Sequence, residues 1–156
     1  MNLENKLLQK LAETKPVGER HELTISEGAW TAHLTYDRRD EMSGRLWEAA
    51  LHRNSAADGN LQAWAGHIVQ RVSGLMESLK IVEVDAVKQH ALLRSAAPSV
   101  KGENLFYYEI LLRGTANATI QRFQGSQLPA KRREQVAFAL THETLAKLAA
   151  DVTAEK

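Results

Sequence analysis

The sequence contains no cysteine among its 156 residues. Disulfide bonds, thiolate metal sites and cysteine nucleophiles are therefore excluded, and the absence is typical of a protein in a reducing compartment. A domain of this size buries roughly 68–70% of the surface that its unfolded chain exposes, so it folds without covalent cross-links. We expect a single domain over residues 1–156, with a helix and turn in 1–18 and a frayed tail at 154–156.

A long hydrophobic run is also lacking. No stretch approaches the roughly 18 apolar residues of a membrane span. The leucines near the N-terminus are interrupted by Glu4 and Lys6, so they do not form the apolar core of a signal peptide. We therefore expect a soluble, cytoplasmic protein that makes no membrane contact.

An excess of charge of either sign is absent as well. The chain has 20 Lys and Arg against 19 Asp and Glu, which gives a net charge of +1. Because nucleic-acid binding usually needs a strongly basic face, a nucleic-acid partner is not expected. The hydrophobic content of 44% is that of a globular protein and argues against disorder.

The usual signatures of catalysis are missing from the sequence. No two of the six histidines are closer than 12 positions, whereas helical zinc sites place two histidines four apart. The Gly-x-Ser-x-Gly elbow, the phosphate loop and the dinucleotide-binding pattern do not occur. Glu83 and Asp85 share one face of a strand, but solvated strand polarity explains this pair more simply. We therefore predict no catalytic residue, no metal site and no cofactor.

Three segments have the apolar spacing of helices. In residues 3–14 leucines recur on one face after a capping residue, Asn2. This short helix packs either on the sheet of its own domain or on a partner. Residues 60–79 carry the widest apolar stripe and begin after Asp58 or Asn60. The stripe consists of Leu61, Trp64, Ala65, Ile68, Val69, Val72, Leu75, Met76 and Leu79.

The last helix is predicted to begin at Thr141, which is a good N-cap. Glu143 in its first turn suits the helix dipole, because the N-terminal end of a helix carries a partial positive charge. Leu145, Leu148 and Val152 recur at helical spacing and form its inner face.

Alternation of apolar and polar residues predicts strands elsewhere. Residues 20–36 form a hairpin around Gly28. The five charges of 37–41 are interpreted as a solvated turn. Residues 43–53 suit either a strand or a helix, and a third strand is favoured because it extends the hairpin. Further strands are predicted at 82–86, 90–95, 105–112, 115–124 and 136–140, with loops at 54–59, 96–103 and 125–133.

The fold predicted from these elements is α+β. It has a mostly antiparallel sheet of about six to eight strands and three helices, in the order α-βββ-α-ββββ(β)-α. Both halves consist of strands followed by a helix, so we expect the helices to lie on one face of the sheet.

Two features point to binding. Lys131, Arg132 and Arg133 form a basic run, which is either an anion patch together with Arg122 and Lys101 or an ordinary charged loop.

The second feature is the strand at 105–112, which is apolar on both faces apart from Glu109. Since adjacent strand residues face opposite ways, Tyr107 and Tyr108 look to different sides of the sheet. Either the strand is covered on both sides within one core, or its second face binds a protein or a second copy of the chain.

The leading hypothesis is a non-catalytic protein-interaction or self-associating module, with a homodimer or a protein as partner. The alternative is a small-molecule-binding protein or enzyme with a pocket between sheet and helices, for which Trp47, Trp64, Tyr107 and Arg94 are the candidate lining residues. The candidate binding residues are Lys131, Arg132, Arg133, Tyr107, Tyr108, Trp47, Trp64 and Arg94.

Overall fold

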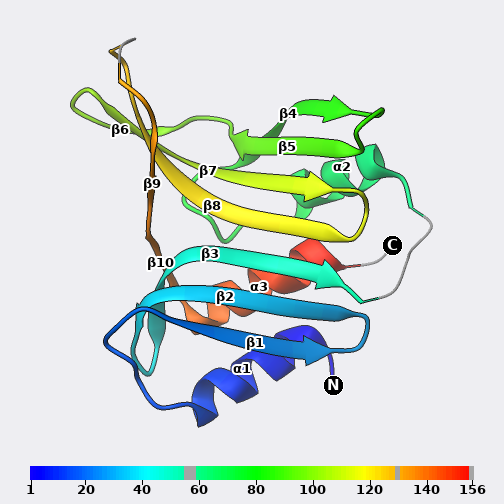
Figure 1. The fold of residues 1–156 in the computed structure, drawn as a ribbon, viewed down its shortest axis with the longest axis vertical. Coiled ribbons are helices and arrows are strands. Elements are labelled where there is room, and N and C mark those ends of the chain that lie inside the picture. The colour runs from blue at the N-terminus through cyan, green and yellow to red at the C-terminus, as the bar shows by residue number, and fades with distance from the viewer. Residues whose placement is uncertain (55–58, 129–130, 155–156) are drawn as a thin grey trace.

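The computed structural model describes residues 1–54, 59–128 and 131–154. Within them, three helices cover one face of an antiparallel sheet of ten strands (Figure 1). This confirms the α+β class and the order of elements, although the sheet has more strands than expected. The helices are α1 (Leu3–Glu13), α2 (Leu61–Arg71) and α3 (His142–Thr153). The strands are β1 (His21–Glu27), β2 (Trp30–Arg39), β3 (Ser43–Arg53), β4 (Leu79–Asp85), β5 (His90–Ser95), β6 (Ser99–Lys101), β7 (Asn104–Arg113), β8 (Asn117–Ser126), β9 (Glu134–Val136) and β10 (Phe138–Thr141).

The main sheet runs in the order β1-β2-β3-β8-β7-β5-β4, with every pair antiparallel. β3 and β8 pair only at one end, where Ala49 lies opposite Ile120 and His52 lies opposite Asn117. Beyond that point β9 pairs with β8 and β10 pairs with β3. The single strand predicted at 136–140 is therefore two short strands, interrupted at Ala137, because the chain changes neighbours there.

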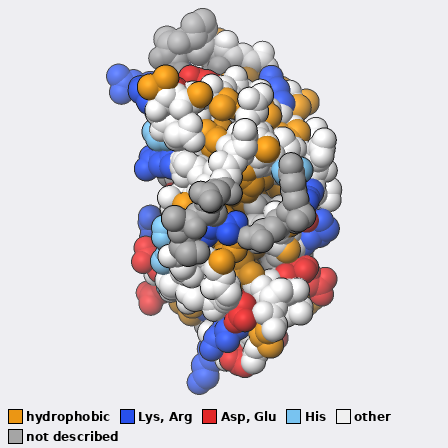
Figure 2. Space-filling view, turned by 90° about the vertical axis from the view of Figure 1, so that its right-hand side faces the viewer, with side chains coloured by type: hydrophobic (Ala, Val, Ile, Leu, Met, Phe, Trp, Pro, Cys, Tyr) orange, Lys and Arg blue, Asp and Glu red, His pale blue; other side chains and the backbone are white. Residues whose placement is uncertain are grey.

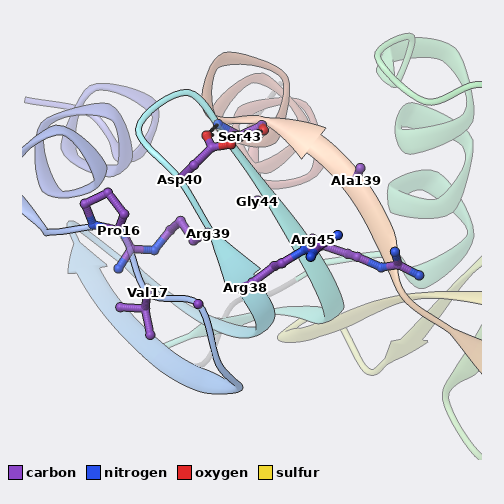
Figure 3. A pocket seen from close by; sticks show the side chains of 10 residues that line it. Pro16, Val17, Arg38, Arg39, Asp40, Ser43, Gly44, Arg45 and Ala139 are labelled. Atoms are coloured by element: carbon purple, nitrogen blue, oxygen red, sulfur yellow. Dashed lines mark hydrogen bonds between the residues drawn. The ribbon is translucent and has the colours of Figure 1, made fainter.

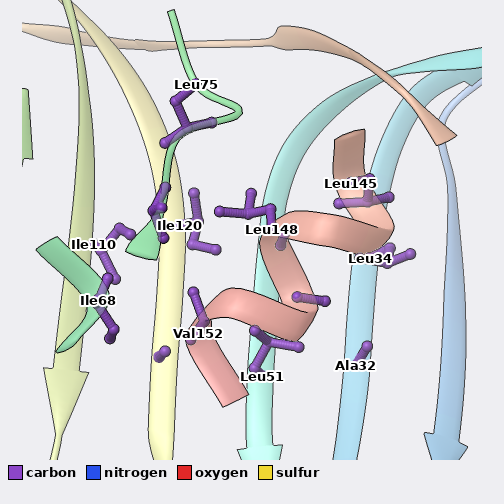
Figure 4. Close-up of a cluster of buried hydrophobic side chains, with 14 of the residues drawn as sticks. Ala32, Leu34, Leu51, Ile68, Leu75, Ile110, Ile120, Leu145, Leu148 and Val152 are labelled. Carbon is purple, nitrogen blue, oxygen red and sulfur yellow. The ribbon is translucent and has the colours of Figure 1, made fainter. Parts of the chain in front are cut away.

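The hydrophobic core lies between the helices and the sheet. Leu145, Leu148 and Val152 of α3 point toward the strands (Figure 4). Leu51 and Ile120 lie on the facing side of the sheet and are almost fully buried. α1 packs against both α3 and β1, which confirms that its leucines dock within their own chain.

The predicted helix starts are confirmed. The side chain of Asn2 accepts a hydrogen bond from Asn5 N, and Asn60 accepts one from Ala63 N. Thr141 accepts one from Thr144 N at 3.1 Å. Each bond satisfies a backbone donor that the first turn of a helix leaves free. Asp58, the other candidate cap of α2, lies outside the described residues.

The second helix is shorter than predicted. α2 ends at Arg71, and Val72 is already extended. Leu75 and Leu79 remain buried although the chain is no longer helical. The prediction that the helix continues to residue 79 is therefore wrong. The irregular segment after Arg71 also buries its apolar residues, so their spacing resembles that of a helix.

The segment after α2 is anchored by a buried ion pair. The Glu77 carboxylate accepts hydrogen bonds from Arg122 Nη1 at 3.0 Å and Nη2 at 3.3 Å. Ser95 and Ser99 donate to its two oxygens at 2.7 and 2.8 Å. Burial alone disfavours the ionised form of Glu77, but these hydrogen bonds outweigh it, so the pKa of the carboxyl is lowered. The Arg122 guanidinium also lies 4.3 Å from the ring centre of Tyr108.

The charged segment 37–41 is not a simple solvated turn. β2 continues through it to Arg39, whose side chain is only 4% exposed. The backbone of Arg39 pairs with Val17 through two hydrogen bonds of 2.8 and 2.9 Å. Its guanidinium donates to Thr14 Oγ1 and His21 Nε2. Hydrogen bonds to Thr14 and His21 therefore hold this arginine inside, and the pattern of charges in the sequence does not predict them.

The remaining differences concern loop boundaries. Residues 43–53 form a strand, as favoured. The loop predicted at 96–103 contains the short strand β6, and β8 extends to Ser126 into the loop predicted at 125–133. β7 is central in the sheet, but the helices cover only one of its two faces (Figure 1).

Candidate functional site on the helix-free face of the sheet

The face of the sheet opposite the helices has an uncharged row at its centre, called here the central row. Strand registers place Leu92 opposite Leu111, Leu111 opposite Thr119 and Thr119 opposite Ala50. These four residues come from four neighbouring strands, and each is half-buried by its neighbours. The central row is thus a shallow, largely apolar band across the middle of this face.

The adjacent row contains charges of both signs and is called here the charged row. It follows one line across seven strands and consists of Lys80, Arg94, Glu109, Gln121, Glu48, Thr35 and Glu22. Its β4 and β5 end carries two cations, whereas its β3 and β1 end carries two carboxylates. In Figure 2 this face lies along the left margin, with basic side chains predominating above and acidic ones below. The two ends of the charged row therefore have opposite sign, although the whole chain is nearly neutral.

One carboxylate of the charged row holds two arginines, only one of which belongs to that row. Glu109 Oε2 accepts hydrogen bonds from Arg94 Nε at 2.9 Å and from Arg133 Nη1 at 2.6 Å. Arg94 Nη2 lies 2.7 Å from the same oxygen. The Glu109 side chain is only 8% exposed, so this charge is desolvated. Two cations and one anion leave a net charge of +1 on the cluster.

Aromatic rings support the two arginines. Arg94 lies 5.1 Å from the ring centre of Tyr107, and Arg133 lies 3.9 Å from that of Phe123. Burial disfavours the charge of Arg133, but Tyr107 and Glu109 more than compensate and raise its pKa. The Arg133 guanidinium therefore remains charged, and both guanidiniums are held against aromatic rings. The hollow around them has a volume of about 430 Å³ and is lined by Leu92, Arg94, Tyr107, Glu109, Leu111, Thr119, Gln121 and Arg133.

Three of the candidate residues from the sequence meet in this hollow, namely Arg94, Tyr107 and Arg133. Tyr108 points to the helix side, where its ring packs edge-on against Phe138. Trp64 also lies on the helix side, where its Nε1 donates to the carbonyl of Val152.

The four residues expected to line a pocket between sheet and helices therefore do not line one site. Trp47 is half-buried and lies beneath the Arg20 guanidinium, whereas Arg94 and Tyr107 line the hollow on the helix-free face. Trp64 is on the opposite side of the sheet.

The basic run is likewise divided among separate contacts. Lys131 pairs with Glu103 at 3.2 Å, and Arg132 is exposed. Only Arg133 reaches the sheet face. Arg122, expected near this run, is buried against Glu77, and Lys101 lies over the Phe106 ring.

Sequence reasoning missed Glu109 as a site residue, although it is the one charge in an otherwise apolar strand. Because alternate residues of a strand face the same way, Tyr107, Glu109 and Leu111 lie on one face. The sequence alone is therefore enough to group these three residues. Thr119 and Gln121 complete the hollow only through the pairing of β7 with β8, which the sequence does not specify.

No helix within the described residues has the length and apolar character needed to cross a membrane. Among the same residues, no group of three His, Asp or Glu side chains is arranged to hold a metal ion. Comparisons with protein-family models, with curated proteins and with solved structures gave no significant match.

Proposed function

We propose that this chain is a non-catalytic interaction module that packs the helix-free face of its sheet against a second copy of itself. The observation that carries this proposal is the pair of rows described above. An uncharged central row lies beside a charged row whose two ends have opposite sign.

The size of the face supports this proposal. Seven strands at about 4.8 Å spacing, each contributing about seven residues, span roughly 800 Å². A standard interface buries about 800 Å² on each partner. The face is therefore large enough for a specific dimer, and a net charge of +1 gives little repulsion between copies.

The charge gradient supports one arrangement of the two copies. A two-fold axis parallel to the strands and passing near β8 reverses the order of strands between the packed sheets. It places Lys80 and Arg94 of one copy over the end of the charged row that contains Glu22 and Glu48 in the other. Lys80 then faces Glu22 on both sides of the axis, and Arg94 faces Thr35 between the two carboxylates. Glu109, together with the two arginines that it binds, faces Glu48, while the two central rows pack together.

The arginine cluster adds specificity to this arrangement. Glu109 neutralises only one of its two arginines, so Arg94 and Arg133 together present a positive charge that is already partly desolvated. Because their positions are restrained before binding, less conformational entropy is lost when a carboxylate of the second copy approaches.

The oligomeric state of two matched variants tests this proposal. Leu111→Arg introduces a cation into the central row of both copies. We expect it to weaken self-association at least about 100-fold, on the order of 2.7 kcal/mol. Val87→Arg makes the same chemical change at a side chain that is 95% exposed on the β4–β5 turn. This variant should dimerise like the wild type.

Sedimentation equilibrium over a wide concentration range gives both dissociation constants. A wild type that stays monomeric at the highest concentration contradicts the proposal. Equal weakening by the two variants also contradicts it, because the effect then does not depend on the sheet face.

A further inference from the structure

A second hollow lies at the end of the sheet where β2 turns into β3. Its volume is about 550 Å³, within the range of small-molecule sites. It is lined by Pro16, Val17, Gly18, Arg38, Arg39, Asp40, Ser43, Gly44, Arg45 and Ala139. Three arginines and one aspartate give this lining a formal charge of +2.

Two of these arginines oppose one another across neighbouring strands. Arg38 of β2 is the register partner of Arg45 of β3, and both side chains extend toward β10 (Figure 3). Like charges in this position destabilise a sheet. A counter-charge is provided only by Asp37 among the described ion pairs of these two arginines, and its Oδ2 lies 4.0 Å from Arg45 Nε. A bound anion between the two guanidiniums relieves this repulsion.

The third arginine is a buried cation that has no carboxylate partner among the described residues. Arg39 is only 4% exposed, and its side-chain hydrogen bonds go to Thr14 Oγ1 and His21 Nε2. Its side chain is directed toward Pro16 and Val17, on the other side of the hollow from Arg38 and Arg45 (Figure 3). A buried charge without a counter-ion is unfavourable, and an anion nearby compensates it.

The one carboxylate of the lining is already engaged. Asp40 Oδ1 accepts hydrogen bonds from the backbone N–H groups of Met42 and Ser43, each at 2.8 Å. These bonds lower the pKa of Asp40 and direct its charge into the turn. Figure 3 shows Asp40 beside Ser43, away from the guanidiniums of Arg38 and Arg45. It therefore does not neutralise them.

We propose that this hollow binds a small phosphorylated molecule, with its phosphoryl group between Arg38 and Arg45. A phosphate monoester carries a charge of about −1.5 to −2 at neutral pH, which matches the +2 of the lining. Guanidinium groups bind phosphate oxygens in pairs of parallel hydrogen bonds. The volume exceeds that of a phosphoryl group, so the rest of the ligand lies over Gly18, Gly44 and Ala139.

Titration with inorganic phosphate and pyrophosphate, followed by ³¹P NMR, tests this site. We expect saturable binding of one anion per chain. In Arg38→Gln/Arg45→Gln the dissociation constant should rise at least about tenfold, since two charge-assisted contacts are lost. Both side chains are exposed, so this variant should keep the fold, which a thermal melt without ligand verifies.

A matched double variant controls for general attraction by positive charge. Arg113→Gln/Arg132→Gln removes the same charge from two exposed arginines outside the hollow and should leave binding unchanged. The proposal is overturned if neither anion saturates, if the control weakens binding equally, or if succinate binds as tightly as pyrophosphate.

Discussion

Replacing Glu77 by glutamine should destabilise the protein by about 3–5 kcal/mol, because it leaves the Arg122 guanidinium buried without a counter-charge. The pair is enclosed on both sides, with side-chain exposures of 9% for Arg122 and 6% for Glu77. The substitution keeps the shape of the side chain, so the loss reports the charge and its hydrogen bonds. Urea unfolding at neutral pH measures it.

An exposed ion pair provides the control for this result. Lys147 and Asp151 lie 2.7 Å apart on α3, but the lysine side chain is 51% exposed. Lys147→Ala should therefore change stability by less than about 1 kcal/mol. A loss below 1 kcal/mol for Glu77→Gln would show that Arg122 finds another partner or water and that the pair does not anchor the segment after α2.

The same pair makes stability depend on pH with a defined sign. The pKa of Glu77 is lower in the folded protein than its ordinary value of 4.5. Its contribution to the free energy of unfolding is therefore fully present above that value, and it is lost as the pH falls through the folded-state pKa. Below pH 4.5 the wild type should lose stability more steeply than Glu77→Gln.

Gly44→Ala should destabilise the protein by about 3 kcal/mol, at the upper end of the usual range for overpacking. Gly44 is buried between β2 and β10, and a methyl group there would overlap the ring of Tyr36. The Tyr36 ring is itself fully buried and stacked on His21, so it has little room to move. Thermal unfolding of the variant measures the loss.

Gly66 offers the opposite case within the same chain. It lies inside α2, where an added Cβ meets nothing within 4 Å. Gly66→Ala should raise stability by up to about 1 kcal/mol, since glycine is unfavourable inside a helix. A Gly44→Ala variant that is as stable as the wild type, or more stable, would contradict the close approach of Tyr36 to β3.

Local patterns predict much of this fold. The alternation of apolar and polar residues predicts β1, β2 and β5, because one face of each strand is buried and the other is solvated. Capping residues predict the start of each helix, since a side-chain oxygen of Asn2, Asn60 or Thr141 accepts a hydrogen bond from a free backbone N–H. These are interactions between residues a few positions apart, so they are visible in a single sequence.

Features that depend on distant partners were not predictable. The burial of Arg122 depends on Glu77, which lies 45 positions away in the sequence. The extension of β2 into the charged segment 37–41 depends on contacts of Arg39 with Thr14 and Val17.

The candidate site shows the same limit. Tyr107 and Glu109 share a face by alternation, whereas Arg133 joins them from a separate segment, 24 positions after Glu109.

A cross-linking measurement on the helix-free face tests the proposed dimer most directly. The chain has no cysteine, so a single cysteine in place of Thr119 is the only thiol present. Thr119 lies in the central row on β8, next to the proposed two-fold axis. A bismaleimide whose span matches the roughly 10 Å separation of packed sheets should therefore link two copies efficiently. Lys147→Cys, on the exposed side of α3, should remain unlinked under the same conditions. Equal cross-linking at the two positions, or none at Thr119→Cys, would contradict a dimer formed through this face.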